Sequence, residues 1–327
     1  AGILPACGAG VVNGPVWVAG GDTLAGRALL RALDRTGVEA VGGPEPDLGD
    51  AAAVDAFCAR TRPATVFVAA GKSGGILANQ TLPATLMRDN LLVACHVIDA
   101  ARRHGAERLL YLASSCVYPR DAAQPMREDD LLTAPLEPTC EPYATAKLAG
   151  LTLVRAMRRE HGVRFVAGIT ADVYGPGDDF GVASGHVVPA LIHKMVEARL
   201  SNAPSVDVWG SGRPTRDFLY VDDLADACLT VVEEWNDDRP INISAGAECS
   251  IAELAETIRS VTGYRGAIRF DASRPDGTPR KALDASALRT LGWRPRTTLA
   301  AGIAHTLEWY LAQRRAPRDG AVVEERA

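Results

Sequence analysis

The sequence predicts an α/β protein built on a doubly wound, Rossmann-type parallel sheet, followed by a smaller, mostly helical C-terminal domain. In the first half of the chain, short apolar runs alternate with segments whose apolar residues have helical spacing. One run, residues 65–69, is almost continuously apolar, as expected for a strand buried on both faces. Strands and helices that alternate in this way connect through right-handed crossovers and form a parallel sheet.

The expected elements follow one another in order along the chain. The strands are expected at residues 16–19, 38–41 (a weaker run), 65–69, 108–112 and 165–169. The helices between them have helical apolar spacing through Leu29, Leu30 and Leu33, and over residues 50–60, 90–104 and 143–161. Past residue 176, loops rich in Gly and Pro separate helices near 187–199, 222–235, 250–262 and 299–315. Two strand-like runs, 218–221 and 241–243, are candidates to rejoin the first sheet.

Composition excludes several classes of protein. The 327 residues carry 35 basic and 40 acidic side chains, a net charge of −5, so no excess positive charge indicates a nucleic-acid partner. No apolar run approaches the roughly 20 residues that cross a bilayer. Seven scattered cysteines are typical of reduced thiols rather than of disulfides or a metal site. We therefore expect a cytoplasmic globular protein with no metal, no membrane partner and no signal peptide at its N-terminus.

Residues 20–26 form a glycine-rich turn between the first strand and the first helix. Glycines in such a turn let backbone N–H groups approach a pyrophosphate, and the helix N-terminus adds partial positive charge. A P-loop is excluded, because Arg27 and Ala28 stand where Lys and Ser or Thr would hold phosphate and magnesium. A dinucleotide turn fits better, although Thr23 replaces the middle glycine of a GxxGxxG pattern. A plain strand–helix turn remains the alternative.

The side chain that reads the adenosine ribose should follow the second strand. Asp or Glu at that place binds a free 2′-hydroxyl, and Arg binds a 2′-phosphate. Residues 41–44 contain none of these. Asp22, in the turn itself, would repel a 2′-phosphate if it pointed that way. On this basis we expect a flexible lead-in at 1–15, a dinucleotide-binding domain at 16–175 and a substrate-binding domain at 176–327.

Tyr143 and Lys147 lie four residues apart at the start of a predicted helix, so both side chains share one face. An ammonium beside a phenol favours the phenolate and is expected to lower the pKa of Tyr143 from about 10 toward neutrality. Tyr143 would then protonate a carbonyl oxygen as a hydride arrives. Ser114 directly follows the strand at 108–112, which places its hydroxyl at the same edge of the sheet. An exposed helical pair is the alternative for the tyrosine and lysine alone.

These residues, together with a chain of local matches, resemble the extended short-chain dehydrogenase/reductases over nearly the whole chain. The matching stretches are AGK at 70–72, GGI at 74–76, Asn79, SSCVYP at 114–119, QPM at 124–126, EPT at 137–139, EPY at 141–143, HVVPAL at 186–191, VWGSG at 208–212, RDF at 216–218 and PDGTPRK at 275–281. Such a series of matches is more specific than any single motif.

The resemblance implies an epimerase-reductase whose substrate is GDP-4-keto-6-deoxy-mannose and whose two reactions share one pocket. It gives the acid/base work at C3 and C5 to Cys116 and His186, whose thiol and imidazole both titrate near working pH. It gives reduction at C4 to Tyr143, Lys147 and Ser114, with hydride from a nicotinamide. A buried packing residue for Cys116 and a helix cap for His186 are the alternatives.

The resemblance also implies the ligand contacts. Substrate binding falls to Asn79, Trp209, Arg216 and Lys281, and cofactor binding to Gly20, Thr23, Leu24, Gly26, Asp50, Tyr143, Lys147, Asp172 and Val173. The implied cofactor is NADP(H) and the implied partners are a GDP-sugar and a second copy of the chain. The dimer would form through helices near 84–104 and 143–161, whose apolar stripes fit packing on the sheet equally well.

Three departures from the family pattern lie on the cofactor side. Asp22 and Thr23 replace Arg and Gly in the turn, the loop after the second strand lacks arginines, and Asp172 replaces Asn near the nicotinamide. NAD(H), or a tightly held cofactor, is therefore the alternative to NADP(H). For the function, the alternatives are a related nucleotide-sugar epimerase without net reduction and a non-catalytic sugar-nucleotide-binding homologue.

Overall fold

A five-stranded parallel sheet forms the centre of the molecule. The computed structural model describes residues 14–74, 76–181, 185–274 and 276–315, so the expected lead-in at 1–15 lies almost wholly outside the described residues. The elements of this part are β1 (Val16–Ala19), α1 (Leu24–Arg35), α2 (Ala51–Thr61), β2 (Thr65–Val68), α3 (Ile76–Thr81), α4 (Pro83–Arg103), β3 (Arg108–Ser114), α5 (Glu141–His161), β4 (Arg164–Thr170), α7 (Val221–Glu234), β8 (Ile241–Ile243) and α9 (Ser286–Thr290). The strand order is β1-β2-β3-β4-β8, all parallel.

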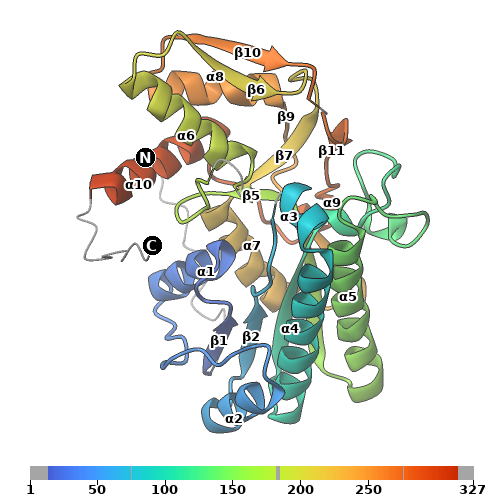
Figure 1. The fold of residues 1–327 in the computed structure, drawn as a ribbon. Coiled ribbons are helices and arrows are strands. Elements are labelled where there is room, and N and C mark those ends of the chain that lie inside the picture. The colour runs from blue at the N-terminus through green and yellow to red at the C-terminus, as the bar shows by residue number, and fades with distance from the viewer. Residues whose placement is uncertain (1–13, 75, 182–184, 275, 316–327) are drawn as a thin grey trace, which may run out of the picture.

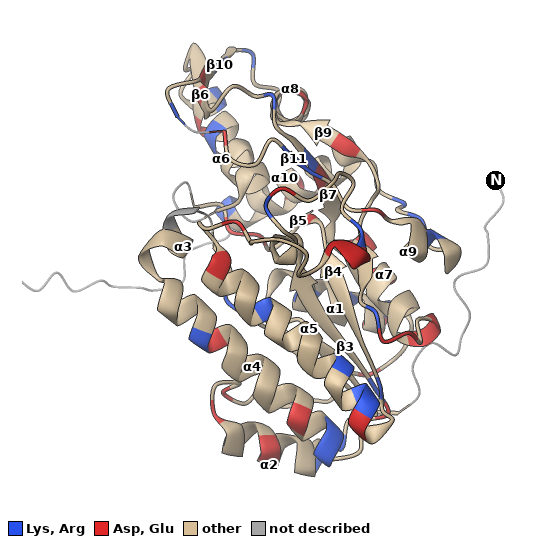
Figure 2. Cartoon of the chain, turned by 90° about the vertical axis from the view of Figure 1, so that its right-hand side faces the viewer, with Lys and Arg blue, Asp and Glu red and all other residues tan. Residues whose placement is uncertain are grey.

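Helices cover both faces of this sheet. α4 and α5 pack side by side on one face, with α2 against α4, and α1 packs with α7 on the other (Figures 1 and 2). The side chains in the middle of the sheet are buried, and in β1 and β2 every residue is buried. This arrangement confirms the predicted doubly wound α/β fold, because parallel strands need such crossovers and bury both faces.

The second part lies beyond the carboxyl ends of these strands and has its own apolar core. Its elements are β5 (Asp172–Tyr174), α6 (Val187–Leu200), β6 (Ser205–Trp209), β7 (Thr215–Tyr220), β9 (Glu248–Ser250), α8 (Ile251–Thr262), β10 (Ala267–Asp271), β11 (Arg280–Lys281) and α10 (Leu299–Arg315). β11, β7 and β5 form a small parallel sheet, β9 pairs antiparallel with β7, and β6 pairs with β10. Helices α6, α8 and α10 surround this core (Figure 1).

Local chemistry explains where the helices begin and end. Thr23 caps α1 by accepting from the Gly26 N–H, and Ser250 and Glu253 form a reciprocal capping box at the start of α8. α5 ends at Gly162, whose φ of +68° suits a residue without a Cβ atom. No helix among the described residues combines the length and apolar character needed to span a bilayer.

Two sequence expectations about strands need correction. The run at 38–41 does not form a strand; it makes one parallel bridge, between Ala40 and Val16, and one hydrogen bond from the Val41 N–H to the Val16 carbonyl. Of the two candidates to rejoin the first sheet, β8 does so beside β4. The run at 218–221 does not, because β7 instead pairs with β5, β9 and β11.

Candidate active site

The glycine turn after β1 has the geometry of a dinucleotide site. Gly20 has φ of +85°, and a Cβ atom on Gly26 would lie 1.9 Å from the Gly20 carbonyl oxygen, so the turn and α1 approach too closely for a side chain. Thr23 is extended at φ −74°, which explains why glycine is not required there. Within the part of the chain that the structure describes, the Leu24 and Ala25 N–H groups have no hydrogen-bond acceptor. These donors at a helix N-terminus fit a pyrophosphate.

A carboxylate that the sequence analysis missed contacts this turn. Glu45 Oε1 accepts from the Gly20 N–H at 2.5 Å, and the same carboxylate hydrogen-bonds the Gly21 N–H and the Trp17 side chain. Glu45 lies one position beyond residues 41–44, the stretch in which a ribose-binding acid was expected. Asp50, assigned to the cofactor by resemblance, instead caps α2 by accepting from the Ala52 and Ala53 N–H groups.

Ser114, Tyr143 and Lys147 meet at the carboxyl end of β3 and the start of α5, but not as the spacing predicted. The Ser114 hydroxyl hydrogen-bonds the Tyr143 phenol. The Lys147 ammonium is turned toward the sheet, donating to the Leu112 carbonyl at 3.2 Å and lying 3.5 Å from the Ala70 carbonyl. Burial raises the pKa of Tyr143 above its usual 10, against the predicted fall, and lowers the pKa of Lys147 to about 8. Tyr143 therefore stays protonated and is an acid rather than a phenolate.

Cys116 lies in a 3-10 turn directly after β3, where two neighbours favour its thiolate. The pKa of its thiol lies below the usual value, first because the Cys140 thiol hydrogen-bonds it and then because the Lys281 ammonium lies 3.9 Å from Sγ; burial opposes both. Ser114 also hydrogen-bonds Cys116, accepting from its backbone N–H at 3.4 Å. Ser114 therefore touches both the phenol and the thiol. No local signal in the sequence links Cys140 to Cys116.

A carboxylate at the start of β5 gathers two cations beside this thiol. Lys281 Nζ lies 2.9 Å from Asp172 Oδ1, and Arg216 Nε lies 3.8 Å from Asp172 Oδ2. Arg216 also donates to the carbonyls of Thr215 and Thr278 at 2.8 and 2.7 Å. The Lys281 ammonium holds the pKa of the Asp172 carboxyl below its usual value, although burial alone would raise it. Asp172 was assigned to the cofactor, but the residues that it contacts, Arg216 and Lys281, were assigned to the substrate.

His186 is exposed immediately before α6, where its side chain makes no cap hydrogen bond. His186 lies within electrostatic reach of the carboxylates of Asp172 and Asp178. Val173 follows Asp172 in β5 and is half-buried beside Leu219 of β7. Among the described residues, His186 therefore lies close to Asp172 and makes no hydrogen bond to the Cys116 thiol.

Trp209 and Asn79, two residues assigned to the substrate, contact other parts of the chain. Trp209 ends β6 with 64% of its surface exposed, and the Arg274 guanidinium lies 5.1 Å from its ring centre. Asn79 in α3 donates to the Gly74 carbonyl at 2.9 Å and so holds the loop that precedes its own helix. Among the described residues, the ring contacts of Trp209 are with Lys194 and Arg274 rather than with the serine, the phenol or the thiol.

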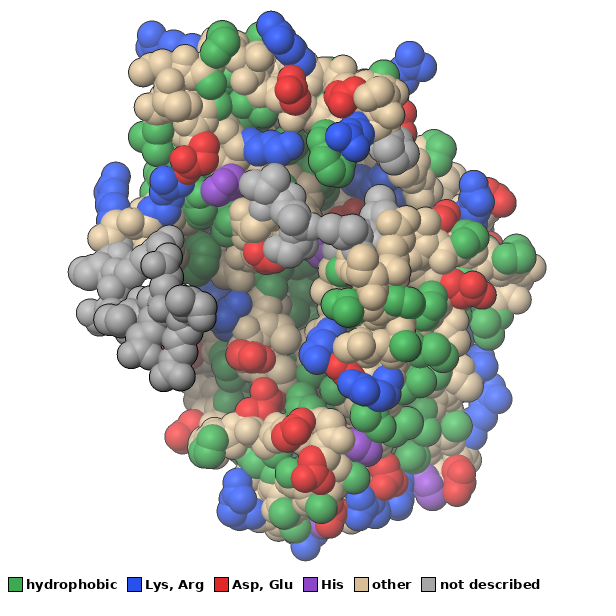
Figure 3. All heavy atoms as spheres, viewed as in Figure 1, with side chains coloured by type: hydrophobic (Ala, Val, Ile, Leu, Met, Phe, Trp, Pro, Cys, Tyr) green, Lys and Arg blue, Asp and Glu red, His purple; other side chains and the backbone are tan. Residues whose placement is uncertain are grey.

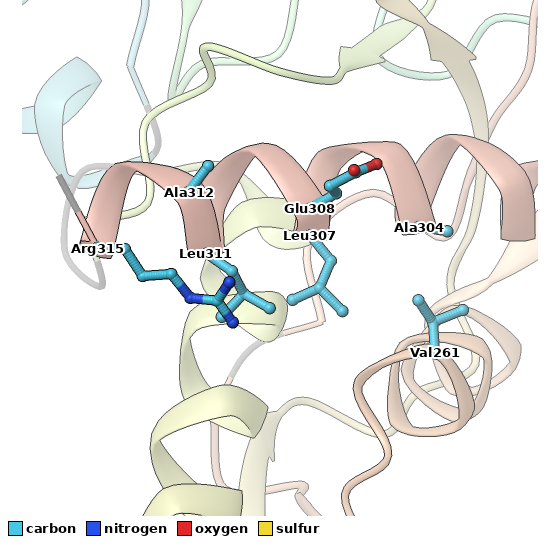
Figure 4. A pocket seen from close by; sticks show the side chains of 7 residues that line it. All are labelled: Val261, Ala304, Leu307, Glu308, Leu311, Ala312 and Arg315. Carbon is cyan, nitrogen blue, oxygen red and sulfur yellow. The ribbon is translucent and has the colours of Figure 1, made fainter.

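One surface hollow lies away from these residues. It lies between α8 and α10 and is lined by Val261, Ala304, Leu307, Glu308, Leu311, Ala312 and Arg315 (Figure 4). These side chains are mostly aliphatic and include no thiol, phenol or imidazole. We therefore place the candidate site at the carboxyl edge of the central sheet, where open α/β sheets bind their ligands.

Known proteins share the sequence and the fold of this chain. Residues 16–245 match the NAD dependent epimerase/dehydratase family. GDP-L-fucose synthase of Sinorhizobium fredii is 44% identical over 299 residues, covering 91% of this chain and 95% of that protein. The enzyme of the same name from Escherichia coli K12 is 44% identical over 308 residues, covering 90% and 96%. A GDP-L-fucose synthetase from Naegleria fowleri bound to NADP has a TM-score of 0.84 at 26% identity, covering 92% and 95%.

Proposed function

The chain belongs to the NAD dependent epimerase/dehydratase family, and from this we propose that it converts GDP-4-keto-6-deoxy-D-mannose to GDP-L-fucose. The reaction combines epimerisation at C3 and C5 with nicotinamide-dependent reduction at C4. Relatives named GDP-L-fucose synthase over nine-tenths of the chain support the substrate. The observation that carries the chemistry is that Ser114 hydrogen-bonds both the Tyr143 phenol and Cys116, which joins a proton donor and a thiol base in one pocket.

Epimerisation uses the acidity of the protons beside the C4 ketone. Loss of a proton from C3 or C5 leaves an enolate whose charge is delocalised onto the C4 oxygen. The Cys116 thiolate is the base for this step, since its neighbours lower its pKa. His186 is the partner that returns a proton to the opposite face of the sugar, from the loop before α6. The ketone is regenerated after each inversion.

Reduction uses the phenol. A bound nicotinamide supplies the hydride that C4 requires. Tyr143 gives its proton to the C4 oxygen, and its buried, protonated state suits this role. Lys147 is held by sheet carbonyls on the same side of the pocket, where it binds the cofactor ribose. The ligand contacts assigned to Gly20, Leu24 and Gly26 belong to the same cofactor.

Two cations near the thiol suit an anionic substrate. Arg216 and Lys281 carry two positive charges, and the Asp172 carboxylate and the Cys116 thiolate carry two negative charges beside them. The two cations are the proposed contacts of the diphosphate of a GDP-sugar, with Asn79 and Trp209 as further proposed contacts. For the cofactor, the resemblance favours NADP(H); NAD(H) is the alternative that the missing arginines favour.

Incubation in deuterium oxide with the 4-keto substrate and each reduced coenzyme tests the proposal. We expect deuterium at C3 and C5, oxidation of one coenzyme per sugar, and GDP-L-fucose by NMR. Deuterium incorporation without coenzyme oxidation would instead identify the second candidate, a nucleotide-sugar epimerase without net reduction, which the departures on the cofactor side favour. Binding of the GDP-sugar without either reaction would identify a non-catalytic homologue.

We further propose a cytoplasmic homodimer with a cofactor domain at 16–175, which α7, β8 and α9 rejoin, and a substrate domain formed by the rest of 176–327. The proposed interface uses the exposed sides of α4 and α5, which lie next to each other (Figure 2). The apolar residues of these helices differ in burial. Val97, Leu151 and Val154 are buried in the chain's own core, whereas Leu92 and Val93 are half-buried. Size-exclusion chromatography with light scattering tests the dimer.

A further inference from the structure

The segment between α1 and α2 carries a carboxylate where a dinucleotide fold reads the adenosine ribose. Residues 40–41 run beside β1, since Ala40 bridges Val16 and the Val41 N–H donates to the Val16 carbonyl at 2.7 Å. This single bridge lies beside β1, at the place where the second strand of the nucleotide unit would lie. Glu45 follows the bridge along the chain and lies 19 residues after Gly26, close to the separation of about 20 expected for a ribose-binding acid.

The contacts of Glu45 hold its carboxylate against the turn. It accepts from the N–H groups of Gly20 and Gly21 and from the Trp17 side chain. A carboxylate offers about four acceptor positions, so at least one remains for a hydroxyl of the bound ribose. The donors of Leu24 and Ala25 at the start of α1 remain available for the pyrophosphate, so the two ligand groups do not compete for the same protein atoms.

The surroundings of Glu45 disfavour a 2′-phosphate. The sequence contains no Lys or Arg from residue 36 to residue 59, a stretch that carries five acidic side chains. Figure 3 shows acidic side chains on this face in front of β1 and β2. The three arginines of α1 are committed elsewhere: Arg27 donates to the Gly177 carbonyl, Arg31 pairs with Asp222, and Arg35 pairs with Asp226.

We propose that Glu45 binds the adenosine ribose hydroxyls and makes the enzyme selective for NAD(H) over NADP(H). This inference rests on the proposed function only in requiring a nicotinamide dinucleotide at the glycine turn. A 2′-phosphate carries a charge between −1.5 and −2 at neutral pH, and at this position it meets the Glu45 carboxylate in a segment, 36–59, that holds no Lys or Arg to pair with it. A free 2′-hydroxyl instead donates to that carboxylate.

The test is binding, measured without sugar substrate by titration calorimetry and by the fluorescence of the reduced coenzymes. NADH and NADPH differ only in the 2′-phosphate, so the ratio of their Kd values isolates the contact. We expect the native protein to bind NADH at least about tenfold more tightly than NADPH, the scale of one hydrogen bond to a charged group. Competition by 5′-AMP and 2′,5′-ADP should follow the same order.

The variant Glu45→Gln removes the charge and keeps the size of the side chain. We expect it to bind NADH about tenfold more weakly and to bring the two Kd values together. Glu39→Gln is the matched control, because it removes an equal charge from an exposed residue of the same segment, and it should leave the ratio unchanged. Circular dichroism on each variant confirms folding.

The outcomes separate the selectivity from the proposed reaction. If the native protein binds NADPH as tightly as NADH, or if Glu45→Gln leaves the ratio unchanged, the role assigned to Glu45 is wrong while the epimerase-reductase function stands. If the native protein binds neither dinucleotide, both the selectivity and the nicotinamide-dependent reduction are wrong. The ratio of the two Kd values is measured on the native protein, so the inference can be refuted even if Glu45→Gln does not fold.

Discussion

Removing the Lys281 ammonium should raise the pKa of the Cys116 thiol by a calculable amount. Nζ lies 3.9 Å from Sγ. Two unit charges at this separation attract by about 1 kcal/mol in bulk water and about 4 kcal/mol at an effective dielectric constant near 20. One pKa unit corresponds to about 1.4 kcal/mol, so Lys281→Met should raise the thiol pKa by roughly 1 to 3 units. The hydrogen bond from Cys140 remains in this variant and keeps part of the shift.

The assay follows alkylation of the free enzyme by iodoacetamide across pH. Only the thiolate reacts, so the pH at half-maximal rate reports the thiol pKa, and peptide mass spectrometry resolves Cys116 from the other six cysteines. The base form of Cys116 is also required for exchange at C3 and C5. The acid limb of the exchange rate should therefore move to higher pH by the same amount.

A matched control separates a local charge effect from general loss of stability. Arg159→Met also removes a cation that lies 2.9 Å from a carboxylate, that of Asp238, on the exposed end of α5. It should leave the alkylation profile of Cys116 unchanged. If Lys281→Met also leaves the profile unchanged while the protein remains folded, Lys281 does not stabilise the thiolate, and the hydrogen bond from Cys140 alone accounts for the lowered pKa.

Three further substitutions test the remaining parts of the site and the turn. Tyr143→Phe should slow C4 reduction by about 10²–10⁴-fold yet retain deuterium exchange, whereas equal loss of both would show that the phenol serves both steps. Cys116→Ser should instead abolish most of the exchange, and unchanged exchange by NMR would exclude the thiol as the base. Gly26→Ala should cost about 1–3 kcal/mol or more in urea unfolding, because its Cβ atom would collide with the Gly20 carbonyl. Gly42→Ala, which meets no atom within 4 Å, is the control, and equal midpoints for the two would contradict the collision.

Local patterns located most of the fold. α8 has strong apolar spacing and a cap at each end, and it lies within a residue of its expected bounds, because caps and periodicity are properties of short segments. The run at 38–41 failed for the opposite reason. It is only four residues long and has only β1 beside it, and two glycines and a proline follow it, so it makes a single bridge.

The role proposed for Cys116 comes from the resemblance to a known family. The order of strands and helices, the edge of the sheet proposed to carry the chemistry, and the candidates Ser114 and Tyr143 follow from the sequence alone. These features depend on spacing within one segment, or on the rule that parallel strands end at the same edge. Only the tertiary structure decided how the side chains share that edge. Asp172 pairs with Lys281, 109 positions away, and Lys147 turns from the phenol to the carbonyls of the sheet. Such contacts depend on which distant segments pack together and on how far burial shifts the pKa of each group. A local sequence pattern predicts neither.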